Sequence, residues 1–158
     1  MRSPSLPIVV ALLALQSLAC TWVKYCFQTD IQIGIEGKSC LCSPDMANCN
    51  VDCGGEPCET FCDNKNDCNV DCVDNDYCEV SGRSESVFID CGGSAFCDVS
   101  CEQSSSCEVD CTDGNCIVTC NEGDCTVRNC DLASEDCVVE CGMLGPSARQ
   151  EGDDAVCG

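Results

Sequence analysis

Polar and apolar residues alternate along residues 49–141 in a short unit, Cys-x-Val-x-Cys, that restarts every nine to twelve residues. Ten copies begin within this stretch, and Val or Ile fills the middle position of every copy except the one with Thr60. Because residues i, i+2 and i+4 of a strand share one face, the two Cys and the Val point inward and the residues between them point outward. Short polar turns, such as residues 54–57 and 112–115, separate the units. The pattern predicts ten short strands.

The second outward position of each unit indicates how many strands make one coil. In alternate units it is an aspartate, at intervals of 19, 19 and 20 residues: Asp52, Asp71, Asp90 and Asp110. Units between them carry a hydroxyl there, at intervals of 19 residues: Ser81, Ser100 and Thr119. A near-fixed period with tight turns is typical of a β-solenoid. We therefore expect an all-β fold, a disulfide-stapled parallel β-solenoid with two short strands per 19–20-residue coil and about five coils, with one acidic and one hydroxyl-bearing sheet.

Two cysteines are missing from the repeat, at Gly82 and Val87, and these positions flank the same turn. If partners disappear together, the last Cys of one unit pairs with the first Cys of the next. The two Cys of one strand would lie ~13 Å apart, whereas a disulfide allows at most ~7 Å between Cα atoms. The predicted pairs are Cys53–Cys58, Cys62–Cys68, Cys72–Cys78, Cys91–Cys97, Cys101–Cys107, Cys111–Cys116, Cys120–Cys125 and Cys130–Cys137. The remaining cysteines give Cys42–Cys49, Cys26–Cys40 and Cys141–Cys157, and leave Cys20 over.

The first residues are typical of an export signal. Arg2 precedes an apolar stretch, 6–18, that is too short to span a membrane, and residues 17–19 fit the small-residue cleavage rule. We expect a signal peptide at 1–19, an N-terminal cap at 20–48, the solenoid at 49–141 and a loose acidic tail at 142–158. Cys20 is either cleaved away or carries a lipid that anchors the protein at a cell surface. Export to an oxidising compartment agrees with paired cysteines.

The composition argues against several classes of function. Cysteine accounts for 23 of the 158 residues, well above the level of roughly 8–10% that marks a disulfide scaffold. With 28 acidic residues, 7 basic residues and a net charge of −21, the chain lacks the basic surface that nucleic acids require. It has no His, the commonest general base. Since narrow coils also leave little room for a pocket, we expect no catalysis. No later apolar run reaches membrane length, so we expect no transmembrane segment.

The candidate metal ligands, for Ca²⁺, are Asp52, Asp71, Asp90 and Asp110. Stacked at strand spacing, their carboxylates repel one another, and protonation or a cation relieves the repulsion. Ca²⁺ takes several oxygen ligands, and turn carboxylates lie at the same coil edges. One alternative is a solvated acidic face that keeps the protein soluble. Two others are a thiolate metal sink, which secretion opposes, and a hydroxyl ice-binding face, which the charged neighbours Glu79 and Asp98 oppose.

The Cys-x-Val-x-Cys units, separated by acidic and Gly-containing turns such as residues 112–115, resemble cysteine-rich repeat proteins that are predicted to be secreted and are mostly of unknown function. The resemblance covers residues 49–141 and implies export and architecture. The period is also similar to that of repeat-in-toxin proteins, whose glycine–aspartate turn signature is absent here.

The sequence predicts a secreted structural or interaction module at a cell surface or in an extracellular matrix. Its partners would be divalent cations and a basic protein or matrix surface, with no nucleic acid. The alternative is a secreted effector or toxin that binds a specific host protein through outward aromatic anchors, Phe61 and Phe88.

Overall fold

The computed structural model describes residues 25–32, 35–46, 48–63, 66–142 and 147–158, with side chains from residue 37 onward. The expected signal peptide and Cys20 lie outside the described residues. The described chain is all-β and folds into fourteen strands without a helix. None of its elements is therefore a helix with the length and apolarity that a membrane crossing requires.

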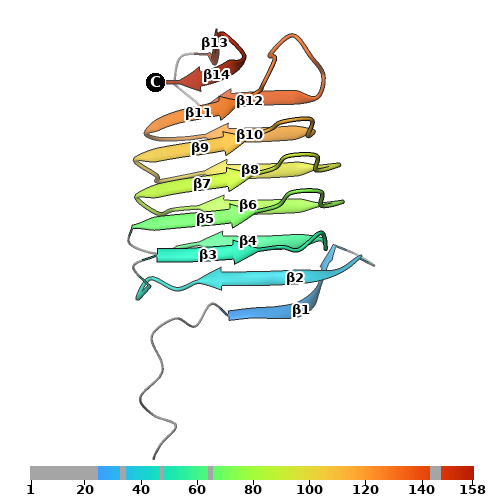
Figure 1. Ribbon diagram of the computed structural model, residues 1–158. Helices are drawn as coiled ribbons and strands as arrows, with labels where there is room; N and C mark the ends of the chain where they lie inside the picture. The colour runs from blue at the N-terminus through green and yellow to red at the C-terminus, as the bar shows by residue number, and fades with distance from the viewer. Residues whose placement is uncertain (1–24, 33–34, 47, 64–65, 143–146) are drawn as a thin grey trace, which may run out of the picture.

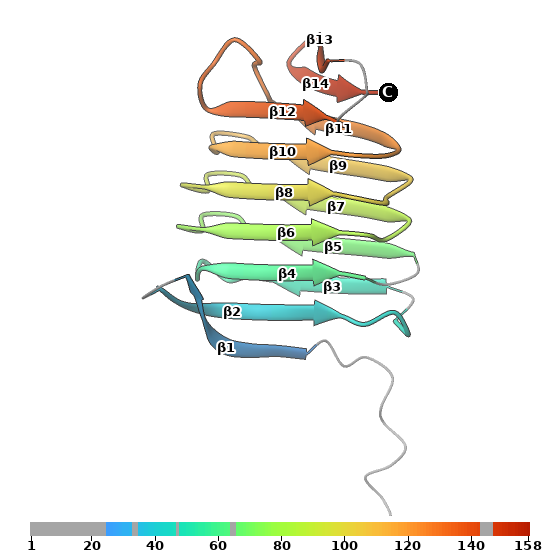
Figure 2. The same cartoon turned by 180° about the vertical axis from the view of Figure 1, so that it is seen from behind.

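The strands form two seven-stranded sheets that face each other and rise in step along one axis (Figures 1 and 2). Sheet A contains, in spatial order, β1 (Tyr25–Gln32), β2 (Ile35–Cys42), β4 (Cys58–Cys62), β6 (Cys78–Gly82), β8 (Cys97–Cys101), β10 (Cys116–Cys120) and β12 (Cys137–Cys141). Sheet B contains β13 (Arg149–Glu151), β14 (Asp154–Cys157), β11 (Asp124–Arg128), β9 (Ser106–Asp110), β7 (Ser86–Asp90), β5 (Asp67–Asp71) and β3 (Asn48–Asp52).

The repeated strands pair in parallel with the equivalent strand of the next coil, so that like positions stack. Val99, for example, lies between Val80 and Val118 in sheet A. Each coil contributes one strand to each sheet, and the coils repeat after 19 or 20 residues, as the spacing of the aspartates predicts. The β-solenoid with two strands per coil and about five coils is thus confirmed.

The core between the sheets is narrow and consists of Val, Ile and cystine. The middle residue of each repeat strand up to β11 is at most 3% exposed, Thr60 included. The cystines flank these residues, each joining the end of one strand to the start of the next, with Cα–Cα distances of 5.6 to 6.4 Å. All eight pairs that the missing-cysteine argument predicts are present. Each closes a loop of five to seven residues, worth ~2 kcal/mol in the chain-entropy treatment.

The turn that lacks a cystine is filled by a side chain. Gly82 is in register with Cys62 and Cys101, and Val87 is in register with Cys68 and Cys107. A Cβ placed on Gly82 would lie 2.9 Å from Cγ2 of Val87. The Val87 side chain therefore occupies the volume that the cystine fills in the neighbouring coils, and glycine opposite it avoids overpacking.

Both ends of the chain differ from the sequence-based expectation. The strand β2 already runs parallel to β4, with Lys38 opposite Cys58, so the stack begins within the segment 20–48 that was expected to be only a cap. The segment 142–158 is not a loose tail, because β13 and β14 form a hairpin that pairs antiparallel with β11. Its reason is hydrogen bonding: the Cys130 N–H donates to the Asp153 carbonyl, so the hairpin satisfies backbone groups at the end of sheet B.

The flanking disulfides follow the expected pairing where side chains are described. Cys42–Cys49 and Cys141–Cys157 are present. Cys40 is disulfide-bonded and lies opposite Cys26 across the β1–β2 pair. The Cys26 side chain itself is outside the described side chains, so the Cys26–Cys40 bond stays a prediction.

The Gly82–Val87 packing can be tested with two variants. The double variant Gly82→Cys/Val87→Cys should form one further disulfide and raise the free energy of unfolding by up to ~2 kcal/mol. Gly82→Ala should instead lower it by ~1–3 kcal/mol, because the new methyl group has no room beside Val87. Urea denaturation measures both effects, and intact mass with and without reduction counts the disulfides. A neutral Gly82→Ala variant would contradict the packing described here.

Candidate functional site on the sheet faces

The Asp row, Asp52, Asp71, Asp90 and Asp110, runs along the outer face of sheet B. Each residue ends its strand, and the parallel registers place the four in line. Neighbouring Cα atoms in such a row are ~4.8 Å apart, the spacing between strands. The structure thus brings together the four residues that the sequence nominated.

Three carboxylates of the Asp row hold the turns that follow them. In each case Oδ1 accepts a hydrogen bond from the backbone N–H two residues later, at 3.1 Å from Val73, 3.0 Å from Gly92 and 3.0 Å from Thr112. This is the local bond that makes aspartate favourable at the start of a turn. The periodic aspartates therefore have a structural reason of their own.

Asp110 is the most strongly held member of the Asp row. It also accepts hydrogen bonds from the Thr112 hydroxyl at 2.7 Å and from Asn129 Nδ2 at 3.0 Å. Asn129 is the extra residue of its repeat unit and adopts a left-handed φ of 54°. Burial raises the pKa of Asp110, but the hydrogen bonds from Thr112 and Asn129 and the charge of Arg128 outweigh it, so the pKa is lowered.

No preformed metal site is present among the described residues. Only two groups of three ligand atoms lie within 4.8 Å of one another, and both consist of cysteines: Cys42, Cys49 and Cys68, and Cys53, Cys72 and Cys78. All six cysteines are in disulfides, so none offers a thiolate. No three carboxylates converge within that distance in the described part of the chain. Ca²⁺ binding by the Asp row stays a prediction.

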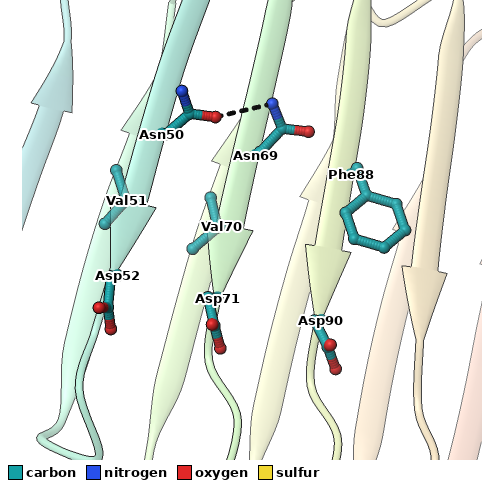
Figure 3. A pocket seen from close by; sticks show the side chains of 8 residues that line it. All are labelled: Asn50, Val51, Asp52, Asn69, Val70, Asp71, Phe88 and Asp90. Atoms are coloured by element: carbon teal, nitrogen blue, oxygen red, sulfur yellow. Dashed lines mark hydrogen bonds between the residues drawn. The ribbon is translucent and has the colours of Figure 1, made fainter.

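A shallow, open depression of about 350 Å³ lies between the Asp row and a second row on sheet B (Figure 3). The second row contains Asn50, Asn69 and Phe88 in register. Asn69 Nδ2 donates to Asn50 Oδ1 at 3.0 Å, and Phe88 is 37% exposed at the end of the depression. The sequence-based expectation of narrow coils without a pocket did not anticipate it.

Sheet A carries a second set of aligned carboxylates, which we call the Glu row: Glu59, Glu79 and Asp98. Burial, and then the charge of Glu79, raise the pKa values of Glu59 and Asp98. Tyr77 donates its hydroxyl to Glu79 Oε2 at 2.7 Å and stacks on Phe96, with ring centroids 5.7 Å apart. These carboxylates are the ones whose charge the protein disfavours.

The hydroxyl row that the sequence predicts is present beside the Glu row, with Ser81, Ser100 and Thr119 in register. The division into one acidic and one hydroxyl-bearing sheet is therefore wrong, since both faces carry carboxylates. The first outward position of every second unit, read with the same 19-residue period, contains the signal for the Glu row. An apolar pair, Leu41 and Phe61, adjoins the hydroxyl row and is about 40% exposed (44% and 39%).

Neutralising the centre of the Glu row should change its titration. In Glu79→Gln, we expect the pKa values of Glu59 and Asp98 to fall toward their ordinary values without fully reaching them, because burial remains. Since a raised pKa means that the folded state binds the proton more tightly, ionisation of the row destabilises the fold at neutral pH. The variant should therefore be more stable at pH 7, by less than ~1 kcal/mol because the groups are largely solvated.

The measurement is carboxyl NMR titration together with urea denaturation as a function of pH. Lowering the pH from 7 through the raised pKa values should remove the cost of the Glu row in the wild-type protein. The stabilising contribution of Asp110 has the opposite sign and is lost only as the pH falls through its lowered pKa, below the ordinary 3.8. The matched control is Glu85→Gln, which removes one charge from an exposed turn. Equal titration curves for Glu59 in both variants would contradict the coupling.

No family model, curated protein or solved structure matches the chain.

Proposed function

We propose that the protein is an exported, non-catalytic structural or interaction module of a cell surface or extracellular matrix, which binds basic surfaces and divalent cations through its carboxylate rows. The observation that carries this proposal is the alignment of carboxylates in register on both faces of one disulfide-bonded framework. A row of like charges at strand spacing has unfavourable mutual repulsion, which a complementary polycation relieves.

The distribution of basic residues supports an acidic surface. Each described Lys or Arg pairs with a nearby glutamate: Lys38 with Glu56, Arg83 with Glu102, Arg128 with Glu108, and Arg149 with Glu151. The described part of the chain therefore offers no basic residue without an acidic partner. With a net charge of −21 for the whole chain, the potential around the protein favours cationic partners.

Export is supported by the disulfides and by the N-terminal sequence. Ten bonds are described, and such a density persists only in an oxidising compartment. Intact mass of the exported protein distinguishes a free module that begins near Thr21 from one that a lipid on Cys20 anchors at the surface.

Binding to a polycation tests the role of the rows. The triple variant Glu59→Gln/Glu79→Gln/Asp98→Asn should bind polylysine at least several-fold more weakly than the wild-type protein. The control variant, Glu85→Gln/Glu122→Gln/Glu135→Gln, removes the same charge from three exposed turn residues and should lose less affinity. Titration by fluorescence anisotropy at two salt concentrations measures both, and affinity should fall as salt rises. Equal losses in the two variants would show that net charge alone attracts polycations.

Calcium is tested separately on the Asp row. We expect Ca²⁺ to raise the thermal midpoint of the wild-type protein, at low and at moderate salt, and to raise it less in Asp71→Asn/Asp90→Asn. Asparagine removes the charge while its Oδ1 can still accept the turn N–H, so the folds remain comparable. An unchanged wild-type midpoint in Ca²⁺ at both salt concentrations would show that the metal part of the proposal is wrong.

The second candidate is a secreted effector that binds one host protein. The exposed neighbours Leu41 and Phe61 on sheet A favour it, because paired apolar side chains on an otherwise polar face can anchor a specific contact. A single purified partner that stays bound at high salt, where polylysine is released, would favour the effector over the matrix module.

A further inference from the structure

The two sheets are displaced from each other by one strand along the axis of the solenoid. Both contain seven strands. The first coil contains β2 and β3, and β1 adds one level below it in sheet A only. At the other end, β12 is the last strand of sheet A, whereas β14 and then β13 continue sheet B above β11. Each end of the molecule is thus a step, and Figures 1 and 2 show the two steps from opposite sides.

The steps leave one strand edge open at each end. Within the described residues, β3 pairs only with β5, and β12 pairs only with β10. In sheet B the first residue of a strand donates to the preceding coil, as Ser86 does to the Asn66 carbonyl. Since N–H groups alternate in direction along a parallel strand, the Asn50 N–H points to the open edge of β3.

The same reasoning applies to β12 in sheet A. There the first residue of a strand donates to the following coil, as Cys116 does to the Asp136 carbonyl. The N–H of Val139, two residues after the start of β12, therefore faces away from β10. Val139 is also only half-buried, whereas Val118 and Val99 in the coils beneath it are fully buried. The end of the core at β12 is incompletely covered.

We propose that copies of this protein stack head to tail into a continuous two-sheet rod. In that arrangement β1 of one copy pairs with β12 of the copy below it, and β3 pairs with β13. Because both sheets contain seven strands and are displaced by one, a single translation closes both edges together. The same translation covers Val139. A head-to-tail contact of this kind does not close on itself, so it produces open filaments.

A second copy fits this site better than an unrelated strand. A free β-strand peptide could pair with one edge only and would leave the other sheet end open. Neither edge strand carries the lysine or proline that commonly protects an exposed edge. The net negative charge opposes self-association, so stacking should require screening by salt.

Sedimentation of the exported full-length protein tests the proposal. We expect monomers at low salt and species of two or more copies as NaCl rises from ~0.1 M to ~1 M, which shortens the Debye length from ~10 Å to ~3 Å. Electron microscopy of the associated material should show unbranched rods of constant width. Monomers at every salt and protein concentration would overturn the proposal.

Two variants block the two ends separately. Val139→Lys places a charge at the uncovered end of the core and should abolish association, whereas Val138→Lys puts the same charge on the outer face of the same strand and should not. Asn50→Pro removes the N–H at the open edge of β3 without a loss of sheet hydrogen bonds and should also abolish association. Its control, Asn50→Ala, removes the same side chain and should associate as the wild-type protein does.

Mixing the two blocked variants identifies the geometry. Val139→Lys retains a free β3 end and Asn50→Pro retains a free β12 end, so an equimolar mixture should form dimers and nothing larger. Association of Val139→Lys alone would exclude β12 from the contact and overturn the proposal, as would a mixture that remains monomeric while the wild-type protein associates. If Val139→Lys fails to form its disulfides, the Asn50→Pro and Asn50→Ala pair still decides the outcome.

Stacking and polycation binding are independent, because salt should strengthen the first and weaken the second. Failure of one therefore leaves a distinct signature from failure of the other.

Discussion

Cystine is the interaction on which the rest of the structure depends. Each coil has two inward aliphatic residues, too few for a conventional core, and the cystines at the two sides fill the remaining interior and close the chain covalently. Sulfur atoms of successive cystines approach to 3.9 Å, as between Cys53 and Cys72, so the cystines themselves stack along the axis. The exception at Gly82 and Val87 follows the same rule, since a valine supplies the lost volume.

A covalently closed interior leaves the outer positions free to serve other purposes. In most proteins a column of aligned carboxylates would cost a substantial part of a marginal stability. Here the raised pKa values of Glu59 and Asp98 show that the cost is present and that the fold tolerates it. A surface that is retained against its own repulsion is a better candidate for binding than one that stabilises the fold.

This distinction separates the two acidic rows. Asp71, Asp90 and Asp110 accept backbone N–H groups of the turns that follow, so their recurrence has a local explanation. Glu59 and Asp98 have no equivalent turn contact among the described hydrogen bonds, and their charge is disfavoured. The periodicity of the sequence pointed first to the Asp row, whereas the electrostatics of the folded protein single out the Glu row.

The amino-acid sequence by itself determined the strands, the 19–20-residue coil, the order of the two sheets and the disulfide pairs, because each follows from spacing along a repeating chain. The missing cysteines at positions 82 and 87 were enough to choose among pairings, since a disulfide joins neighbours in a turn of fixed length. Non-repeating residues offered no such signal. Only the tertiary structure decided that residues 149–157 form a hairpin on β11, that Asn129 reaches Asp110, and that the two sheets are displaced by one strand. These features depend on which backbone groups lack a partner at the ends of the stack, and that is known only once the coils are placed on one another.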